Sequence, residues 1–311
     1  MARYLVTGGA GFIGSHIAEA LAGQGHYVRL LDNFSSGDIS NLSGFAKKID
    51  IIKGDICSPG VCLKAASGMD FVFHQAAIKS VPRSMKEPQE YNRVNIGGTL
   101  NMLEAAKRSR VRRFIFASSS SVYGQANSFP EKETLVPGPI SPYALSKLTG
   151  EYYCRIFSLH FGVPAIVLRY FNVFGPRQPH DDEYAGVIPK FIDCLMHGRR
   201  PPVFGSGRQS RDFTFVKNVV EANLLAAKAG KLKYGIFNIA CGRDITVLKI
   251  IRLLNGIFGR EVAPLFLEKR AGDIFRSLAD INRARREIRF RPTVDFETGL
   301  RLTVDYWRDH E

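Results

Sequence analysis

Two side chains capable of acid–base chemistry, Tyr143 and Lys147, stand four residues apart, just after the pair Ser141-Pro142. A Ser-Pro pair is typical of a helix start, with the serine as N-cap and the proline at the first helical position. Residues four apart share one helical face, so the spacing sets a phenol beside an ammonium group. Such a cation lowers the tyrosine pKa from its usual value of about 10, which makes Tyr143 a candidate base. Taken alone, the pair fits the exposed face of an amphipathic helix better.

A glycine-rich loop gives this pair a possible partner. Residues 2–7 are predicted to form a short buried strand, and Gly8-Gly9-Ala10-Gly11-Phe12-Ile13-Gly14 follows before a predicted helix. Glycines at such a turn let the backbone approach a pyrophosphate, and the helix offers free N–H groups to it. The next predicted strand, Tyr27–Leu31, ends at Asp32, whose carboxylate can bind a ribose 2′-hydroxyl. The unit therefore indicates a dinucleotide site, and the acidic side chain favours NAD over NADP.

Strand and helix patterns then alternate as far as residue 175. Further strands are predicted at Ile49–Lys53, Phe71–His74, Arg113–Ala117 and Ala165–Leu168, with a helix around Pro88–Arg108. This alternation predicts an α/β fold built on a doubly wound, parallel Rossmann sheet. Ligands bind at the carboxyl ends of such strands, where Asp55, Gln75 and the serine row 118–121 are expected to lie.

After residue 175 the alternation gives way to short elements joined by loops rich in proline and glycine. We therefore expect residues 1–175 to form the NAD-binding domain and residues 176–311 to form mainly a smaller, mixed C-terminal lobe that binds the substrate. Elements from about residues 212–245 are expected to return to the first domain. Within that stretch, Val219–Ala229 has a helical pattern and Ile236–Ala240 is typical of a strand.

The composition argues against several classes of protein. Of 311 residues, 45% are apolar, yet no run of 18 or more apolar residues occurs and the N-terminus lacks the pattern of a signal peptide. The formal charge is +14, but lysine and arginine are spread along the chain without a nucleic-acid-binding motif. We therefore expect a cytoplasmic protein that binds a polyphosphate small molecule, with neither a membrane nor a nucleic acid as partner.

Neither a metal site nor a disulfide is expected. The five cysteines are odd in number and scattered, and none stands at the spacing of a zinc site. His74, at the end of a predicted strand, is interpreted as a histidine with satisfied hydrogen bonds and not as a ligand.

Together these features resemble the extended short-chain dehydrogenase/reductase superfamily over essentially the whole chain. Within it, the sequence is most similar to UDP-hexose 4-epimerases, especially those acting on UDP-N-acetylglucosamine. The motifs that carry the closer resemblance are Gln75-Ala76-Ala77, Ser80-Val81-Pro82-Arg83-Ser84, Arg169-Tyr170-Phe171-Asn172-Val173-Phe174-Gly175 and Ser210-Arg211-Asp212-Phe213.

The resemblance implies NAD as cofactor and a UDP-sugar as substrate. The residues implied for NAD are Gly8, Gly11, Phe12 and Ile13 at the pyrophosphate, Asp32, Asn33, Ser36 and Gly37 towards the adenosine ribose, Asp55 and Ile56 at the adenine, Gln75, Ala76, Ala77 and Lys79 along the middle, and Tyr143, Lys147 and Tyr170 towards the nicotinamide end. Those implied for the substrate are Asn172 at the diphosphate, Val187 at the uracil, Arg211, Arg270 and Asp273 clamping UDP, and Ser80, Arg83, Ser119, Ser120, Tyr143 and Ser277. Arginine forks suit a diphosphate, and aspartate accepts from ribose hydroxyls.

The resemblance also implies a mechanism with Ser119, Tyr143 and Lys147 as catalytic residues. Tyr143 takes the proton of the sugar 4-hydroxyl, a hydride passes from C4 to NAD, and the 4-keto sugar turns over before the hydride returns. Ser119 bridges the hydroxyl and the phenol, with Ser118 and Ser120 as the alternatives if the register slips by one. Related dehydratases and decarboxylases carry carboxylates at the positions of Ser120 and Ser121, so the serines here favour epimerisation.

Several alternatives stay open. Ser277 stands where the family has either a bulky tyrosine or a small residue, and a small residue leaves room for an N-acetyl group, unless Ser277 is a loop serine without substrate contact. A UDP-glucuronate 4-epimerase is the main competitor, although Asn172 favours neutral sugars. A non-catalytic NAD-binding scaffold is the alternative from another class. The resemblance implies a homodimer through a four-helix bundle of the helix before the fifth strand and the Tyr143 helix.

Overall fold

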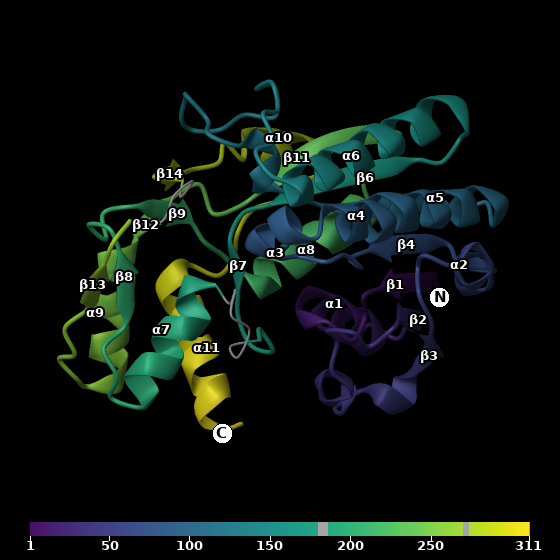
Figure 1. Ribbon diagram of the computed structural model, residues 1–311. Helices are drawn as coiled ribbons and strands as arrows, with labels where there is room; N and C mark the ends of the chain where they lie inside the picture. Colours follow the sequence, from purple (N-terminus) through teal and green to yellow (C-terminus); the bar gives the residue numbers. More distant parts are fainter. Residues whose placement is uncertain (180–185, 270–273, 311) are drawn as a thin grey trace.

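A seven-stranded sheet, in which every neighbouring pair of strands is parallel, forms the centre of the computed structural model (Figure 1). The structure describes residues 1–179, 186–269 and 274–310. In spatial order the strands are β11 (Tyr234–Ile239), β6 (Ala165–Tyr170), β5 (Arg113–Ser119), β4 (Phe71–His74), β1 (Arg3–Thr7), β2 (Tyr27–Asp32) and β3 (Ile49–Lys53). The strand order reverses direction between β1 and β4, and the crevice at such a point is where doubly wound sheets bind ligands. The predicted fold class is confirmed.

Helices cover both faces of this sheet (Figure 1). On one face lie α1 (Phe12–Gly23), α8 (Val216–Ala227) and α10 (Asn282–Glu287), and on the other lie α2 (Pro59–Ala66), α5 (Gly98–Arg108) and α6 (Pro142–His160). Strands covered on both sides are buried along their whole length instead of on alternate residues, and all six residues of β6 are buried.

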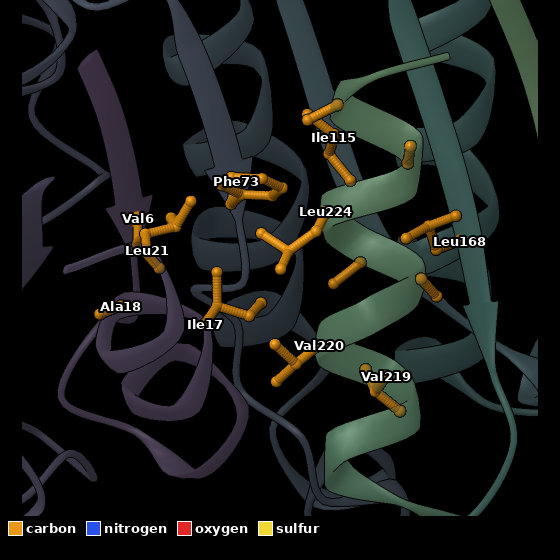
Figure 2. Close-up of a cluster of buried hydrophobic side chains, with 14 of the residues drawn as sticks. Val6, Ile17, Ala18, Leu21, Phe73, Ile115, Leu168, Val219, Val220 and Leu224 are labelled. Atoms are coloured by element: carbon orange, nitrogen blue, oxygen red, sulfur yellow. The ribbon is translucent and has the colours of Figure 1, made fainter. Parts of the chain in front are cut away.

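The packing between α1, α8 and the sheet forms a large apolar core (Figure 2). Val220 and Leu224 of α8 extend towards Ile17 of α1 and Phe73 of β4, and all four side chains are buried. Each fully buried aliphatic or aromatic side chain of this kind contributes about 1.5–3 kcal/mol. The core therefore holds α1, and with it the glycine loop, firmly against the sheet.

A smaller lobe lies beside the carboxyl end of the sheet (Figure 1). Its helices are α7 (Val187–Met196), α9 (Val247–Phe258) and α11 (Phe296–Arg308), and its short strands are β8 (Pro202–Phe204), β9 (Ser210–Asp212), β12 (Asp244–Thr246), β13 (Leu265–Leu267) and β14 (Arg276–Ser277). The central strand β9 pairs antiparallel with β12 and parallel with β14. Two further strands, β7 (Val173–Phe174) and β10 (Thr214–Phe215), pair where the chain passes into and out of the lobe.

The chain returns to the main sheet twice. The first return supplies α8 and the edge strand β11. The second return was not expected from the sequence, because α10 is short and highly charged, yet Ala284, Ile288 and Phe290 are buried in the same core as α1 and α8.

The helix predicted around Pro88–Arg108 is built from three consecutive parts. They are α4 (Pro88–Tyr91), a π-helical turn over Asn92–Gly97, and α5, while the short helix α3 (Val81–Lys86) precedes them. The π turn carries Asn95, whose amide donates to Ile78 O and to Ser146 Oγ and whose oxygen accepts from Ile78 N. Asn95 therefore ties the segment after β4 to α6.

A buried ion pair fixes α6 against the sheet. Glu151 of α6 accepts from Arg169 of β6 through two hydrogen bonds of 2.8 and 2.6 Å, and both side chains are 2% exposed. The same carboxylate accepts a bond of 2.5 Å from Ser118 Oγ at the end of β5. One carboxylate thus connects α6 to two adjacent central strands.

No helix in the described ranges is long and apolar enough to span a membrane.

We expect Glu151→Ala to lower the free energy of unfolding by about 3–5 kcal/mol, because it leaves the Arg169 guanidinium buried without its counter-charge. Urea denaturation of the two proteins measures the difference. Glu287→Ala is the control, since its ion pair with Arg283 is solvent-exposed, and its effect should stay within about 0.5 kcal/mol. Equal effects of the two variants would contradict the assigned role.

Candidate active site

The glycine loop forms a cradle between β1 and α1. Gly8 has a φ of +66°, and its N–H donates to Leu31 O at 2.8 Å, which closes the loop against β2. A Cβ at Gly14 would lie 2.1 Å from Gly8 O, so only glycine fits there. Gly11 is the N-cap of α1 and offers no side chain to the first-turn amides. Those amides, at the positive end of the helix dipole, suit a phosphate, with Phe12 and Ile13 as the first helical residues.

Asp32 is buried at the end of β2 beside this loop. Its carboxylate accepts from Ala10 N at 2.9 Å and from Phe34 N at 2.8 Å, so the loop orients it. Gly37 packs against it, because a Cβ there would lie 2.9 Å from Ala10 Cβ and 3.1 Å from Asp32 Oδ1.

The other residues predicted for the adenosine end have different surroundings. Asn33 Nδ2 donates to Asp55 Oδ2 at 3.1 Å, which joins the ends of β2 and β3. Ser36 is exposed. Ile56 is 5% exposed and packs into the core against Gly98, so its side chain belongs to the interior.

His74 is part of a closed hydrogen-bond chain at the end of β4. Its Nδ1 is 2.8 Å from Thr7 Oγ1 and its Nε2 is 3.0 Å from Thr99 Oγ1. Thr99 donates to Asn95 O, and Thr7 accepts from Ala76 N, so the bonds are satisfied with the proton on Nε2. Burial, followed by the charge of Lys147, lowers the pKa of His74 to about 3. The interpretation of His74 as a satisfied, neutral histidine is confirmed.

The segment after β4 passes directly over the glycine loop. A Cβ at Gly8 would lie 2.8 Å from Ala76 N. Gln75 hydrogen-bonds Tyr170 and Asn223, whose side chains also bond each other at 2.8 and 3.1 Å. Gln75 and Tyr170 are thus held together, while Ala77 is half-buried and Lys79 exposed along the same segment.

The sequence expectation for the start of α6 is confirmed. Ser141 is the N-cap and accepts from Ala144 N at 3.2 Å, and Pro142 is the first helical residue. Tyr143 lies next to Ser119, whose hydroxyl hydrogen-bonds the phenol, and the Tyr91 ring stands edge-on to it at 6.4 Å. Lys147 is buried, and its Nζ donates to Ala117 O on β5 at 2.9 Å.

The pKa values of this pair correct one expectation. Burial raises the pKa of Tyr143 and outweighs the hydrogen bond from Ser119, which lowers it. The lowered phenol pKa predicted from the Tyr-Lys spacing is therefore wrong for the chain alone. The phenol pKa is not lowered, because the ammonium of Lys147 donates to the Ala117 carbonyl. Burial also lowers the pKa of Lys147 itself to about 8.

The serine row divides between two tasks. Ser118 is buried and donates to Glu151, away from the phenol. Ser119 hydrogen-bonds Tyr143 and also accepts from Ser121 N at 3.2 Å. Ser120 is half-buried at the start of the following turn. The sequence favours Ser119 over Ser118 and Ser120 as the serine beside the phenol, and the structure has Ser119 there.

A cavity of about 300 Å³ opens in the smaller lobe and brings together three residues predicted for the substrate, Asn172, Val187 and Arg211. Asn172 has a φ of +36°, and its Nδ2 donates to Asp212 O at 3.1 Å. The other walls are largely apolar and aromatic, a feature that the sequence did not predict. They include Phe174, Phe191, Phe204 and Phe213.

The remaining predicted substrate residues differ in their placement. Ser277 lies on β14, in register with Arg211, and is 6% exposed, so it is not an exposed loop serine. Ser80 is the N-cap of α3, and Arg83 forms an ion pair with Glu87 on the surface of that helix. Two predicted residues lie outside the described residues. They are Arg270 and Asp273.

The site has the features of a short-chain dehydrogenase/reductase on a Rossmann fold. They are the strand order, the glycine cradle and the cluster of Ser119, Tyr143 and Lys147. The chain belongs to the NAD dependent epimerase/dehydratase family, whose model matches residues 4–240. This family confirms the resemblance stated from the sequence, and similar structures solved with NAD confirm NAD as the predicted cofactor.

Individual relatives match over the full length of the chain. The UDP-N-acetylglucosamine 4-epimerase of Methanobrevibacter ruminantium M1, solved with UDP-N-acetylmuramic acid, is 40% identical, with a TM-score of 0.95 over 100% of this chain and 99% of its own. The UDP-glucose 4-epimerase of Mycolicibacterium smegmatis is 36% identical over 99% of both chains. The UDP-glucuronic acid 4-epimerase of Bacillus cereus is 33% identical, with a TM-score of 0.92 over 99% and 100%. Enzymes named as decarboxylases and dehydratases are also similar to the chain.

We expect Gly11→Ala to weaken NAD binding at least about tenfold while the free energy of unfolding changes by less than about 1 kcal/mol, because its Cβ meets only Gly8 O, at 3.2 Å, on the side open to a phosphate. Gly14→Ala should lower both affinity and stability, since its Cβ clashes with the Gly8 carbonyl. Gly256→Ala, in an uncrowded position of α9, is the control and should leave NAD affinity unchanged. Calorimetric titration with NAD measures the affinities, and unchanged binding in Gly11→Ala would contradict the cradle.

Proposed function

We propose that the protein is an NAD-dependent 4-epimerase of UDP-hexoses that interconverts UDP-GlcNAc and UDP-GalNAc, UDP-Glc and UDP-Gal, or both pairs. The observation that carries the proposal is the cluster of Ser119, Tyr143 and Lys147 at the carboxyl end of β5, with the glycine cradle on the same edge of the sheet. Serines in place of carboxylates at positions 120 and 121 support epimerisation over dehydration or decarboxylation.

Each residue of the cluster has one task in this proposal. Tyr143 removes the proton of the sugar 4-hydroxyl and returns it, and Ser119 relays between hydroxyl and phenol. NAD, when bound, supplies the acceptor and then the donor for the transient oxidation at C4. Lys147, held by Ala117 O, binds the nicotinamide ribose beside the phenol. The 4-keto sugar turns over about its bond to UDP between the two transfers, so the product is the C4 epimer.

The substrate residues support a UDP-sugar in the lobe. Arg211, Asn172 and the first turn of α7 at Val187 line one cavity, which offers a guanidinium, an amide and backbone groups to a nucleoside diphosphate. Ser277, in register beside Arg211, is small and leaves room for an N-acetyl group. The similarity to a UDP-N-acetylglucosamine 4-epimerase supports the N-acetylated pair, and Asn172 supports neutral sugars over a uronate.

Incubation with UDP-GlcNAc, UDP-Glc and UDP-glucuronate, followed by NMR of the sugar signals, tests the proposal. We expect the C4 epimer of at least one neutral sugar, and Tyr143→Phe should lower its turnover by roughly 10² to 10⁴ because the base is lost. Thermal stability of that variant should match the wild type. A protein that retains NAD but epimerises none of the sugars would be the non-catalytic scaffold instead.

We further propose a homodimer formed through α5 and α6. Four large apolar side chains stand along one face of α6 at helical spacing although they are exposed in the single chain. They are Leu145, Tyr152, Ile156 and Leu159, with exposures of 52%, 53%, 43% and 62%. An apolar stripe of this length on a surface helix is typical of a protein–protein interface.

Sedimentation velocity should find the wild type as a dimer and Ile156→Asp as a monomer, because the charge cannot be buried at the interface without a partner. Phe266→Asp is the matched control, since Phe266 is also apolar and exposed but lies on β13 in the smaller lobe. A monomeric wild type, or dissociation of both variants, would refute the interface.

A further inference from the structure

Glu131 is a buried carboxylate in the loop between Ser119 and Tyr143, outside the site described above. It is 3% exposed. Its backbone pairs with the segment that follows β14, because Glu131 N donates to Leu278 O at 2.7 Å and Asp280 N donates to Glu131 O at 2.8 Å. The loop that leads into α6 is thus joined to the strand that carries Ser277.

The side chain of Glu131 faces the same strand. Its carboxylate is hydrogen-bonded by the Ser277 hydroxyl and the Leu278 amide, and the charges of Asp212 and Arg211 on β9 act on it as well. Ser277 and Arg211 are register partners in the β14–β9 pair. The carboxylate therefore stands one hydrogen bond behind Ser277, whose register partner Arg211 lines the cavity of the lobe.

Resting on the proposed function, we propose that Glu131 is a specificity-determining residue that selects neutral UDP-hexoses over UDP-uronates through Ser277. A serine hydroxyl has one proton to donate, and Ser277 donates it to Glu131. Its remaining lone pairs accept from a sugar hydroxyl or an acetamide N–H. A uronate carboxylate has no proton to donate, and the Ser277 hydroxyl can only accept, so the two groups form no hydrogen bond.

Charge repulsion acts in the same direction. A ligand atom that donates a hydrogen bond to Ser277 lies about 4.5–5 Å from the Glu131 carboxylate, the span of two hydrogen bonds that meet at a hydroxyl oxygen. Two like charges at that distance in a partly buried site repel enough for a roughly hundredfold loss of affinity, which salt screening reduces to about tenfold. Neutral sugars incur no such loss.

The preference for neutral sugars over uronates should depend on pH. Burial, with a smaller contribution from the Asp212 carboxylate, raises the pKa of Glu131 to about 7. The hydrogen bonds from Ser277 and Leu278 and the Arg211 guanidinium act against this rise. The ionised form repels the uronate, so discrimination grows as pH rises through about 7 and fades below it. Asp212, whose pKa burial also raises to about 7, is engaged by the backbone amides of Cys241 and Gly242, and any contribution from it remains in a Glu131 variant.

The test is calorimetric titration of the NAD-loaded protein with UDP-glucose and with UDP-glucuronate between pH 6 and 8, a range centred on the pKa of about 7. In the wild type the ratio of the two dissociation constants should rise with pH by about tenfold, and a flat ratio overturns the proposal without any variant. Glu131→Gln should bind UDP-glucuronate about tenfold more tightly at the upper end of the range and lose most of the pH dependence, while its affinity for UDP-glucose changes by less than about threefold.

The matched control is Glu133→Gln. Glu133 lies two residues away in the same loop, and burial raises its pKa too, but it accepts from Asn238 N at 2.9 Å instead of from Ser277. This variant should keep the wild-type ratio, and an equal change in both variants overturns the assignment to Glu131. A wild type that binds neither nucleotide sugar refutes the proposed function as well, whereas one that epimerises UDP-glucose with an unchanged ratio in Glu131→Gln refutes only the role of Glu131.

Discussion

The position of the phenol at the active site depends on the buried ion pair between Glu151 and Arg169. Tyr143, Lys147 and Glu151 follow one another at intervals of four residues and lie along one face of α6. A buried ion pair adds little net stability compared with apolar side chains, since desolvation offsets the attraction. Its two forked hydrogen bonds instead allow one orientation of the helix about its axis. That orientation turns Tyr143 to Ser119 and Lys147 to Ala117.

Burial is the largest cause of four pKa shifts at and near the site, and in each case it favours the neutral form of the group. It raises the pKa values of Tyr143 and Glu131 and lowers those of Lys147 and His74. A region of this kind has a low effective dielectric, so a single charge brought into it has a large effect. The low dielectric raises the phenol pKa in the chain alone. For the same reason, a positive charge on a bound ligand should lower that pKa strongly.

Much of the fold followed from local patterns in the sequence. The glycine loop, the Ser-Pro helix start and the apolar strand runs depend on neighbouring residues, and each was found where it was predicted. The contacts of Glu131 and the burial of α10 could not be predicted, because they join segments far apart in the sequence that carry no periodic pattern. The phenol pKa was wrong for a related reason: spacing gives the distance between two groups but not how deeply the fold buries them. The roles of the individual site residues stay predictions.

The return of α8 to the main sheet sets the order in which the protein can be completed during synthesis. Val220 and Leu224 cover an apolar face made by α1, β1, β4 and β5, all of which leave the ribosome well before them (Figure 2). At about 5 to 20 residues per second, the stretch from Tyr170 to Ala227 takes roughly 3 to 11 seconds to synthesise. Throughout that interval the nascent sheet exposes the face on which the glycine loop rests, and it is then open to water, to a chaperone or to another chain.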